Sequence, residues 1–542
     1  MSAECYPMSV LPNMSRLYGD YLALGEQAAD APVRGWFGAE PAGVGWMGRD
    51  GGGADRVALA GALQAQSLRL GAGEVALANI ERLRGGAKAV VTGQQVGLFG
   101  GPLLTLLKAA TAVARAREAT AATGVAHVPV FWLATEDHDL AEVDQVSLLG
   151  KHAVETLRLG LADRGLAVGG VPLNPGVADV IAQVSELLAY APVCDLLREC
   201  YAPDQKPDQT LGAAFARFMT RLFAAHGLIV MDAAGRDFHA LGSLALRAAI
   251  ERAGELEAAL LQRTRELETN GYHAQVLVKP GASLLFLIGE TTRERLALRR
   301  TGELAWKAGT KSCSTADLLA ILEAEPERLS PNALLRPVFQ DAILPTAAYI
   351  GGPAEIAYFA QSAVLYELIL GRITPVLPRF SATLIEPAIA TVMAKDEVSL
   401  EDVFAAKTPD ALALRLGARA MPIEGKRKLA AVGNAMDQEL GALTGYLAAM
   451  DASLGRSALV SASKMRYQMN RLRRMAATFE VQKQASLRKH AEAMMLHLFP
   501  DGHPQERVVA GAYFLAQYGD GLIDRLVAEA GEMCLGHSVV RL

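Results

Sequence analysis

The sequence predicts an α/β fold in which a parallel sheet of Rossmann type carries long insertions and is followed by an α-helical coiled-coil domain. Short apolar segments alternate with helical stretches over the first two thirds of the chain, which is typical of parallel sheets. These segments are unevenly spaced, which indicates inserted subdomains. Further along, apolar residues recur every three or four positions, a pattern typical of paired long helices.

The apolar segments are short enough to be strands of one buried sheet. The expected strands are Ala87–Thr92, His127–Ala134, Gly227–Asp232, Thr346–Ile350 and Thr374–Leu377. Pro102 suits the first turn of a helix expected over Leu103–Glu118. Insertions are expected at about residues 150–225 and 235–345. In the second of these, Gln275–Val278 and Ser283–Ile288 flank a Lys-Pro-Gly turn and predict an antiparallel hairpin.

A core over residues 1–394 is expected to precede a helical domain over residues 395–505, with residues 506–542 returning to the core. The apolar series of the helical domain is Leu429, Val432, Met436, Leu440, Leu443, Leu447, Met450 and Leu454, then, after a break at Gly455, Met465, Met469, Leu472, Ala476 and Phe479. Two antiparallel helices fit this pattern, with the chain returning near Pro500. Such a hairpin should pack on the sheet domain, on a second copy of the chain, or on both. A helical lobe without a dimer role is the alternative.

The composition argues against several classes of protein. The 542 residues are too many for one ordinary core, and a net charge of −5 without a basic stripe argues against a nucleic-acid partner. No apolar run reaches about 18 residues, and the first residues do not resemble a secretory signal, so no membrane association is expected. Five cysteines without a CxxC pair suit reduced thiols in the cytoplasm; they are Cys5, Cys194, Cys200, Cys313 and Cys534.

A glycine-rich loop over Gly93–Gly101 follows the first expected strand. Its candidate substrate-binding residues are Gly93, Gln94, Gln95, Gly97 and Gly100. Backbone N–H groups before a helix favour phosphate or carboxylate, and the glutamines add neutral donors and acceptors. The spacing is neither GxGxxG nor that of a P-loop. A tight packing turn between strand and helix is the alternative.

Three carboxylates and an imidazole follow the second expected strand, where ligands bind in open α/β sheets. Glu136, Asp137, His138 and Asp139 are therefore the candidate catalytic residues. His138 exchanges protons near neutral pH, which suits acid–base catalysis. No second His or Cys pair completes a zinc site, so no metal ligands are assigned and metal dependence stays open. A solvated acidic helix cap is the alternative.

Two later segments add possible anion-binding groups. The candidate substrate-binding residues there are Asn332, Arg336, Tyr349, Glu355, Tyr358 and Arg379. Arg336 is suited to hold a carboxylate bidentately. Glu355 and Tyr358 should share one face at the start of a helix. Arg379, after the last expected strand, is a second candidate clamp, with a surface ion pair as the alternative.

Four long stretches resemble those of the bacillithiol biosynthesis cysteine-adding enzymes, the BshC family; they are GQQVGLFGGP, PVFWLATEDHDLAEVD, LPTAAYIGGPAEIAYF and TPVLPRFSATLIE. The resemblance spans nearly the whole chain and includes PQER at Pro504–Arg507 and Tyr518-Gly519. It implies a Rossmann-type core with connecting-peptide insertions, similar to class I aminoacyl-tRNA synthetases, and a coiled coil used for homodimerisation. It also implies a pocket for ATP or ADP near the coiled coil. Neither the HIGH nor the KMSKS motif of the synthetases is present.

The reaction implied by the resemblance is the last step of bacillithiol synthesis, in which the carboxyl of L-cysteine is joined to the amine of glucosaminyl-malate. His138 or Asp137 would then take the proton of the attacking ammonium, and Arg379 or Arg336 would hold the malate carboxylates. Two alternatives stay open: a nucleotidyltransferase with an unknown acceptor, and a non-catalytic scaffold that organises pathway partners. Crowded acids at a strand end favour an enzyme.

Overall fold

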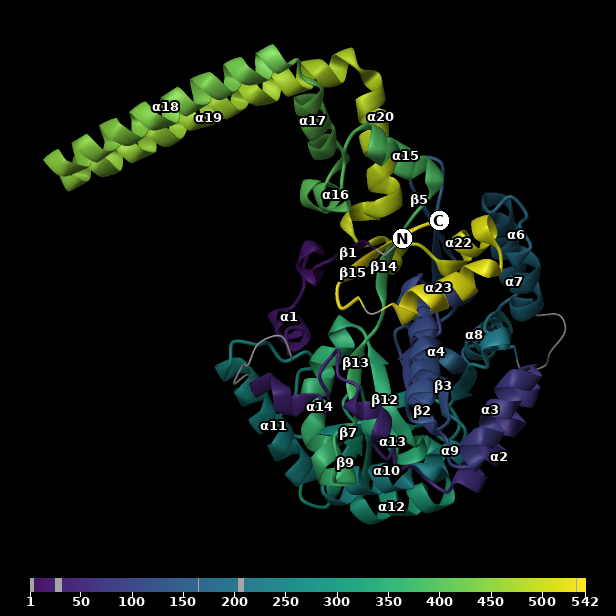
Figure 1. Ribbon diagram of the computed structural model, residues 1–542. Coiled ribbons are helices and arrows are strands. Elements are labelled where there is room, and N and C mark those ends of the chain that lie inside the picture. Colours follow the sequence, from purple (N-terminus) through teal and green to yellow (C-terminus); the bar gives the residue numbers. More distant parts are fainter. Residues whose placement is uncertain (1–3, 25–31, 164, 203–208, 533) are drawn as a thin grey trace. The chain divides into compact units, whose positions relative to one another are not determined.

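The computed structural model describes residues 4–24, 32–163, 165–202, 209–532 and 534–542 (Figure 1). The chain divides into two compact units. The first contains Met1–Gly150, Val154–Thr383 and Glu506–Val540, and the second contains Lys151–Ala153, Leu384–Gln505 and Arg541–Leu542. Most of the second unit is therefore inserted into the sequence of the first.

A parallel five-stranded sheet lies in the first unit. Its strands are β2 (Lys88–Gln94), β3 (His127–Leu133), β6 (Ile229–Asp232), β12 (Thr346–Gly351) and β13 (Val376–Pro378). The spatial order β6-β3-β2-β12-β13 is the Rossmann order 3-2-1-4-5, and all neighbouring strands are parallel. The five expected strands are confirmed, since each is an apolar run buried within the sheet. The strand order reverses between β2 and β12, which is where this fold binds ligands.

Helices cover the sheet. α4 (Leu104–Thr123) connects β2 to β3 and contacts β2, β3 and β12. The expected helix after Pro102 is thus confirmed, and it ends where Gly124 adopts a left-handed conformation with φ of 69°. α14 (Pro353–Leu370) contacts β12 and β13. The remaining helices outside the insertions are α1 (Arg16–Leu22), α2 (Arg56–Arg69), α3 (Glu74–Arg84), α21 (Gln505–Val508), α22 (Gly511–Tyr518) and α23 (Gly521–Gly531).

The chain between β3 and β6 forms a helical insertion with one hairpin. It contains α5 (Leu140–Val143), the antiparallel pair β4 (Gln145–Leu149) and β5 (Val154–Arg158), then α6 (Val177–Leu187), α7 (Val193–Tyr201) and α8 (Leu211–Leu222). Backbone hydrogen bonds attach this insertion to the end of β3, because the N–H groups of Val168 and Gly169 donate to the carbonyls of Asp137 and Thr135 at 2.8 Å. The insertion therefore fixes the loop that carries the predicted acids.

The chain between β6 and β12 carries a second sheet, which is antiparallel. Its strands are β7 (Ala282–Ile288), β8 (Arg295–Arg300), β9 (Ala305–Ala308), β10 (Lys311–Ser314) and β11 (Leu329–Pro331), in the order β10-β9-β8-β7-β11. The helices are α9 (Arg236–Leu241), α10 (Ser243–Glu251), α11 (Ala253–Thr269), α12 (Thr315–Ala324) and α13 (Arg336–Ile343).

The hairpin predicted within this second insertion is wrong in its first half. β7 corresponds to the expected strand Ser283–Ile288, but its partners are β8 and β11, and residues 275–278 form no strand. The side chain of Gln361 explains the difference. It accepts from the N–H of Val276 at 2.8 Å and donates to its carbonyl at 2.9 Å, so this backbone is satisfied without a neighbouring strand.

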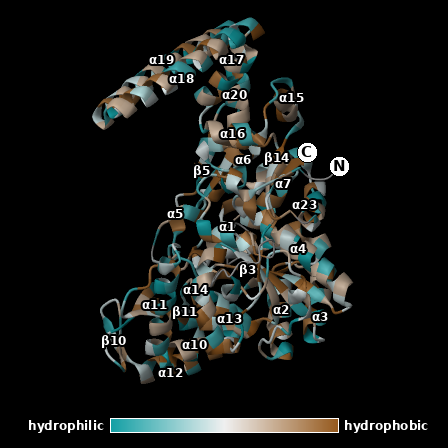
Figure 2. Ribbon diagram, turned by 60° about the vertical axis from the view of Figure 1, so that its left-hand side comes forward, coloured by the Kyte–Doolittle hydropathy of each residue, from teal (hydrophilic) through white to brown (hydrophobic). Residues whose placement is uncertain are grey.

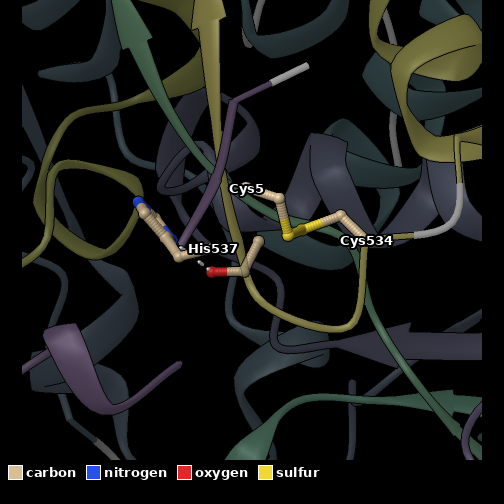
Figure 3. The surroundings of a disulfide bond; sticks show 4 residues. Cys5, Cys534 and His537 are labelled. Atoms are coloured by element: carbon tan, nitrogen blue, oxygen red, sulfur yellow. Dashed lines mark hydrogen bonds between the residues drawn. A yellow bond between two sulfur atoms is a disulfide. The ribbon is translucent and has the colours of Figure 1, made fainter. Parts of the chain in front are cut away.

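A three-stranded sheet joins distant parts of the chain, in the order β1 (Glu4–Tyr6), β15 (His537–Arg541) and β14 (Ser381–Ile385). Cys5 and Cys534 form a disulfide with a Cα–Cα distance of 6.2 Å, close to His537 (Figure 3). The expectation of five reduced thiols is therefore wrong for this pair, because strand pairing joins positions 529 residues apart that share no local sequence signal. Cys194, Cys200 and Cys313 are not in a disulfide.

The second unit is helical. It contains α15 (Pro387–Lys395), α16 (Leu400–Ala406), α17 (Pro409–Ala420), α18 (Ile423–Met450), α19 (Ala452–Lys483) and α20 (Ala485–Leu498). The long pair α18 and α19 confirms the predicted helical hairpin, but the break lies at Asp451 and not at Gly455. The Asp451 carboxylate caps α19 by accepting from the N–H groups of Ser453 and Leu454. Gly455 lies within α19, where a Cβ would be 2.6 Å from the Cβ of Ala448.

The predicted apolar series on α18 and α19 divides into buried and exposed positions. Leu440 and Met469 are buried between the helices, together with small residues such as Ala462. Leu443 and Leu472 are each 52% exposed. Figure 2 shows polar and apolar residues interspersed along both helices. Within the described ranges, no helix combines the length and apolar character needed to cross a membrane.

Candidate active site

A cavity of about 660 Å³ opens at the carboxyl ends of β2, β3 and β12. Its wall includes Gly93 and Gln94 from β2 and Tyr349 from β12, so it lies at the point where the strand order reverses. This volume is within the ordinary range for small-molecule sites. All but three of the predicted site residues line it; those lining it are Gly93, Gln94, Gln95, Glu136, Asp137, His138, Asn332, Arg336, Tyr349, Glu355, Tyr358 and Arg379.

Carboxylates gather at the end of β3. Asp137 accepts from Nε2 of Gln95 at 2.7 Å, and the same nitrogen donates to Glu142 at 3.1 Å. Asp137 also accepts from the N–H of His138 at 2.7 Å, and Nδ1 of His138 lies 3.3 Å from the same oxygen. The His138 side chain is 70% exposed. Gln95 therefore fixes two carboxylates, while His138 stays accessible to solvent.

Glu136 differs from its neighbours because a buried histidine lies behind it. Oε1 of Glu136 is 3.4 Å from Nε2 of His239, whose side chain has no solvent exposure. Nδ1 of His239 lies 3.1 Å from the carbonyl oxygen of Pro326. Burial alone would lower the pKa of His239, but Glu136 raises it above its ordinary value.

A buried ion pair supports the base of the cavity. Nζ of Lys108 lies 2.5 Å from Glu355 and donates to the carbonyl of Gly93 and, at 3.0 Å, to Oε1 of Gln94. Glu355 also accepts from the hydroxyl of Tyr349 at 2.6 Å. Burial alone would raise the pKa of Glu355, but Lys108 holds it below its ordinary value. Glu355 is therefore an internal counter-ion whose oxygens are already engaged.

Arg336 presents a charge that no carboxylate neutralises directly. It donates to the hydroxyl of Tyr358 at 2.7 Å and to Gln340 at 3.3 Å, and it lies over the ring of Tyr349. Among the described residues, no Asp or Glu lies within ion-pair distance of it. Neutral partners fix the guanidinium but leave its positive charge available to an anion.

Arg379 is placed differently, because its charge is already neutralised. It forms a buried, two-point ion pair with Glu506, with one contact at 3.0 Å. Glu506 also accepts from the N–H of Ala382 at 3.0 Å and from the hydroxyl of Ser381. Burial alone would raise the pKa of Glu506, but Arg379 holds it at about 2. Arg379 thus lines the cavity while fixing the segment that follows the helical unit.

Three predicted residues lie outside the cavity wall. Gly97 and Gly100 belong to a turn whose N–H groups are engaged: that of Gly97 donates to Gln95 at 3.1 Å, and that of Gly100 donates to the hydroxyl of Tyr201 at 3.3 Å. A Cβ on Gly100, whose φ is 90°, would lie 2.5 Å from the ring of Phe218. These two glycines therefore belong to a tight packing turn between strand and helix, the alternative given for this loop in the sequence analysis. Asp139 is exposed and caps α5.

The two parts of the chain match two models of one family. Residues 47–380 match "Bacillithiol biosynthesis BshC, N-terminal Rossmann-like domain", and residues 382–542 match "Bacillithiol biosynthesis BshC, C-terminal coiled-coil domain". The chain belongs to the BshC family. The resemblance inferred from the motifs is therefore confirmed, as are the Rossmann-type core and the coiled-coil domain.

Relatives of this BshC-family chain match it over most or all of its length. A protein of Koribacter versatilis is 43% identical and one of Solibacter usitatus is 36% identical, each over 100% of both chains. A protein of Salinibacter ruber is 34% identical over 87% of this chain and 86% of its own. Each carries the name "Putative cysteine ligase BshC".

Several residues in or directly behind the cavity wall of this BshC-family chain were missed from the sequence. Arg295 lies over the ring of Phe286 at 3.5 Å and donates to Ser330 at 3.2 Å. Several other arginines lie close to it in the sequence, so no sequence pattern distinguished it as a site residue. Arg507 was visible within PQER but had no assigned role. Lys108 was detectable as the one charged residue in the apolar stretch Leu103–Ala114. His239 follows β6 closely and could have been found as a titratable group beyond a strand end.

Proposed function

We propose that this protein is a ligase that joins the carboxyl of L-cysteine to the amine of glucosaminyl-malate, the last step of bacillithiol synthesis. The mixed charge of the cavity supports this proposal best. Carboxylates reach it from the loop after β3, and arginines reach it from β8, α13 and α21. The two substrates carry the complementary groups, since each has an ammonium and both have carboxylates.

Arg295 and Arg336 are the proposed partners of the malate carboxylates. Both line the cavity, and both are fixed by neutral acceptors, so a substrate anion would gain a charge-assisted contact with either. The substrate ammonium groups would face Glu136, Asp137 and Glu142. The attacking amine must lose a proton before it can attack, and these carboxylates are proton acceptors in the cavity wall.

Amide formation from a free carboxylate is uphill in water and requires an activating co-substrate, for which we propose ATP. Arg295, Arg336 and Arg507 fit phosphate charge as well as carboxylate charge. Two smaller cavities, of about 40 and 20 Å³, are too small for a nucleotide. When bound, ATP would supply the phosphoanhydride that makes activation of the carboxyl favourable.

We also propose that the protein works as a homodimer in the cytoplasm. The exposed apolar side chains of α18 and α19 support an association of two copies through these helices. A cytoplasmic location follows from the proposed use of ATP, whose pool lies inside the cell.

The direct test is mass spectrometry of the purified protein incubated with cysteine and glucosaminyl-malate, with and without ATP and magnesium. We expect bacillithiol only when ATP is present, and release of AMP or ADP identifies the activated intermediate. Arg295→Met, which keeps an unbranched side chain but removes the anion partner, serves as the impaired control once circular dichroism shows that it is folded. Pyrophosphate release without amide would favour a nucleotidyltransferase, and no turnover under any condition would favour a scaffold.

A further inference from the structure

His239 is a buried histidine whose two ring nitrogens face different acceptors. Nδ1 faces the carbonyl oxygen of Pro326 at 3.1 Å, and a carbonyl only accepts, so Nδ1 carries a hydrogen. Nε2 faces Oε1 of Glu136 at 3.4 Å, and in this arrangement it makes no hydrogen bond. Glu136 lines the cavity, whereas His239 has no solvent exposure. The histidine thus reaches the cavity only through the carboxylate.

The pair is favourable only when it holds one shared proton. If Nε2 lacks a hydrogen and Glu136 is ionised, a buried lone pair faces an anionic oxygen, which leaves both groups unsatisfied. If Nε2 carries a hydrogen, an imidazolium faces a carboxylate at ion-pair distance. If Glu136 carries it, the neutral imidazole accepts from the carboxyl. The pair therefore has a place for one proton that arrives from the cavity side.

The carboxylates around the pair favour its protonation, and one nearby cation opposes it. Glu327 from the turn Pro326–Arg328 and Asp232 at the end of β6 face His239, in addition to Glu136. Arg295 from β8 interacts electrostatically with Glu136 and opposes protonation of the pair, because it is a cation. Burial alone would lower the pKa of His239, but Glu136 and, to a smaller extent, Glu327 raise it above that of a free imidazole. This direction brings the histidine closer to the basicity of an amino-sugar amine.

We propose that Glu136 contacts the attacking ammonium and that His239 is a positioning residue behind it, which stores the proton that the amine loses. This inference rests on the ligase function proposed above. The ammonium N–H donates to the Glu136 carboxylate, and its proton ends on Nε2 as an imidazolium beside ionised Glu136. The nitrogen keeps its electron pair and becomes the nucleophile. Asp137 and His138 then bind substrate and do not take this proton.

The first test observes the proton directly and needs no turnover. Labelling the full-length protein with [¹³Cε1]-histidine gives one C–H signal for each of its ten histidines, and the signal lost in His239→Gln belongs to His239. We expect a titration midpoint above that of free histidine. Glu136→Gln should lower this midpoint by about one pH unit or more, a tenfold loss of proton affinity. An equal midpoint in Glu136→Gln overturns the pairing.

The second test separates proton storage from substrate binding. Ligation by the wild type should slow as the pH falls, because the pair is then already protonated. His239→Gln should lower kcat by about 10²- to 10⁴-fold, leave KM for glucosaminyl-malate almost unchanged and remove this acidic limb of the pH profile. His127→Gln is the matched control, since His127 is also buried, bonds to the carbonyls of Val125 and Met47, and lies outside the cavity wall. It should keep the acidic limb.

The two tests distinguish failure of the inference from failure of the proposed function. If the wild type makes no amide with any activating co-substrate, the ligase function is contradicted. In that case, a titration midpoint of His239 that depends on Glu136 would still support the proton-sharing pair. A wild type that ligates, together with a His239→Gln variant that is folded by circular dichroism and keeps the acidic limb, overturns the role of His239 and leaves the ligase function standing.

Discussion

At the scale of single residues, the cavity combines charges that the chain neutralises internally with charges that it leaves for a ligand. Arg379 and Glu506 neutralise each other, and so do Lys108 and Glu355. Arg295 and Arg336 have only neutral acceptors among the described residues. The internally paired charges should therefore contribute mainly to the stability of the fold, and the two arginines without an anionic partner should contribute mainly to substrate affinity.

Glu506→Gln should destabilise the protein by about 3–5 kcal/mol, because it leaves Arg379 buried without an anion. The folded pKa of Glu506, about 2, lies below its ordinary 4.5. Its stabilisation is therefore present above about pH 4.5 and is lost as the pH falls towards 2. Urea unfolding followed by tryptophan fluorescence at pH 7 and pH 3 measures both effects.

Glu40→Gln is the matched control for this substitution, since Glu40 pairs with Arg34 at 2.6 Å but both side chains are exposed. It should change stability by about 1 kcal/mol or less. Equal urea midpoints for Glu506→Gln and the wild type at pH 7 would show that the buried pair does not stabilise the fold.

Arg295→Met should weaken binding of the malate-bearing substrate, because methionine offers no cation to a carboxylate at that position. Loss of such a contact costs about 2–5 kcal/mol, so KM for glucosaminyl-malate should rise by about 30-fold or more, with a smaller change in KM for cysteine. Arg299→Met is the control on the same strand, because Arg299 is exposed and lies outside the cavity wall. Similar KM values for the two variants would remove Arg295 from the site.

At the scale of secondary structure, the sheet could be predicted because its strands are apolar runs without alternation, as burial on both faces requires. The two errors have different causes, one long-range and one local. Residues 275–278 satisfy their backbone through Gln361, which is far away in the sequence. The helix break depends on the Asp451 cap, while Gly455, which looked like the break, instead allows close packing against Ala448.

The residues of the candidate site could likewise be predicted only where local sequence determines their position. Glu136 and Asp137 could be found because they directly follow a buried strand, and the topology of the sheet then places them at its ligand-binding edge. Arg295 and His239 come from an insertion whose placement against that edge depends on tertiary packing. The sequence alone could not reveal that Arg379 is neutralised, because Glu506 lies 127 positions away.

The exposed apolar positions of α18 and α19 carry a prediction about assembly. Leu443→Glu combined with Leu472→Glu should convert a dimer into a monomer, because both side chains are about half exposed and a charge buried between two copies would lack a partner. Size-exclusion chromatography with light scattering gives the mass of each species. Glu439→Gln, at an exposed position of α18, should leave the mass unchanged. A monomeric wild type at micromolar concentration contradicts the proposed dimer.

At the scale of the whole molecule, segments from both ends of the chain complete the first unit. β1 pairs with β15, and β15 lies next to β14 in the same sheet. The Cys5–Cys534 disulfide adds a covalent connection between these segments. Closing so long a loop restricts the unfolded chain, so the bond should stabilise the folded state when it is oxidised.

The oxidised wild type should therefore be more stable than the protein treated with dithiothreitol, by about 2–5 kcal/mol. Cys5→Ser should unfold at the same urea concentration with or without the reductant, because the bond cannot form. Cys313→Ser, which changes a cysteine outside the disulfide, should keep the difference. A wild type that responds no more to the reductant than Cys5→Ser would show that the bond is not stabilising.

The position of Glu506 and Arg507 in the sequence has a consequence for synthesis on the ribosome. The strands and acids of the cavity emerge first, and the whole helical hairpin follows before Glu506 can neutralise Arg379 and Arg507 can complete the wall. Until then, closing the first unit would bury an unpaired cation, which is unfavourable. A chain interrupted within the second unit would therefore lack Arg507 in the cavity wall and leave Arg379 without its counter-ion, so that the complete cavity arises only late in translation.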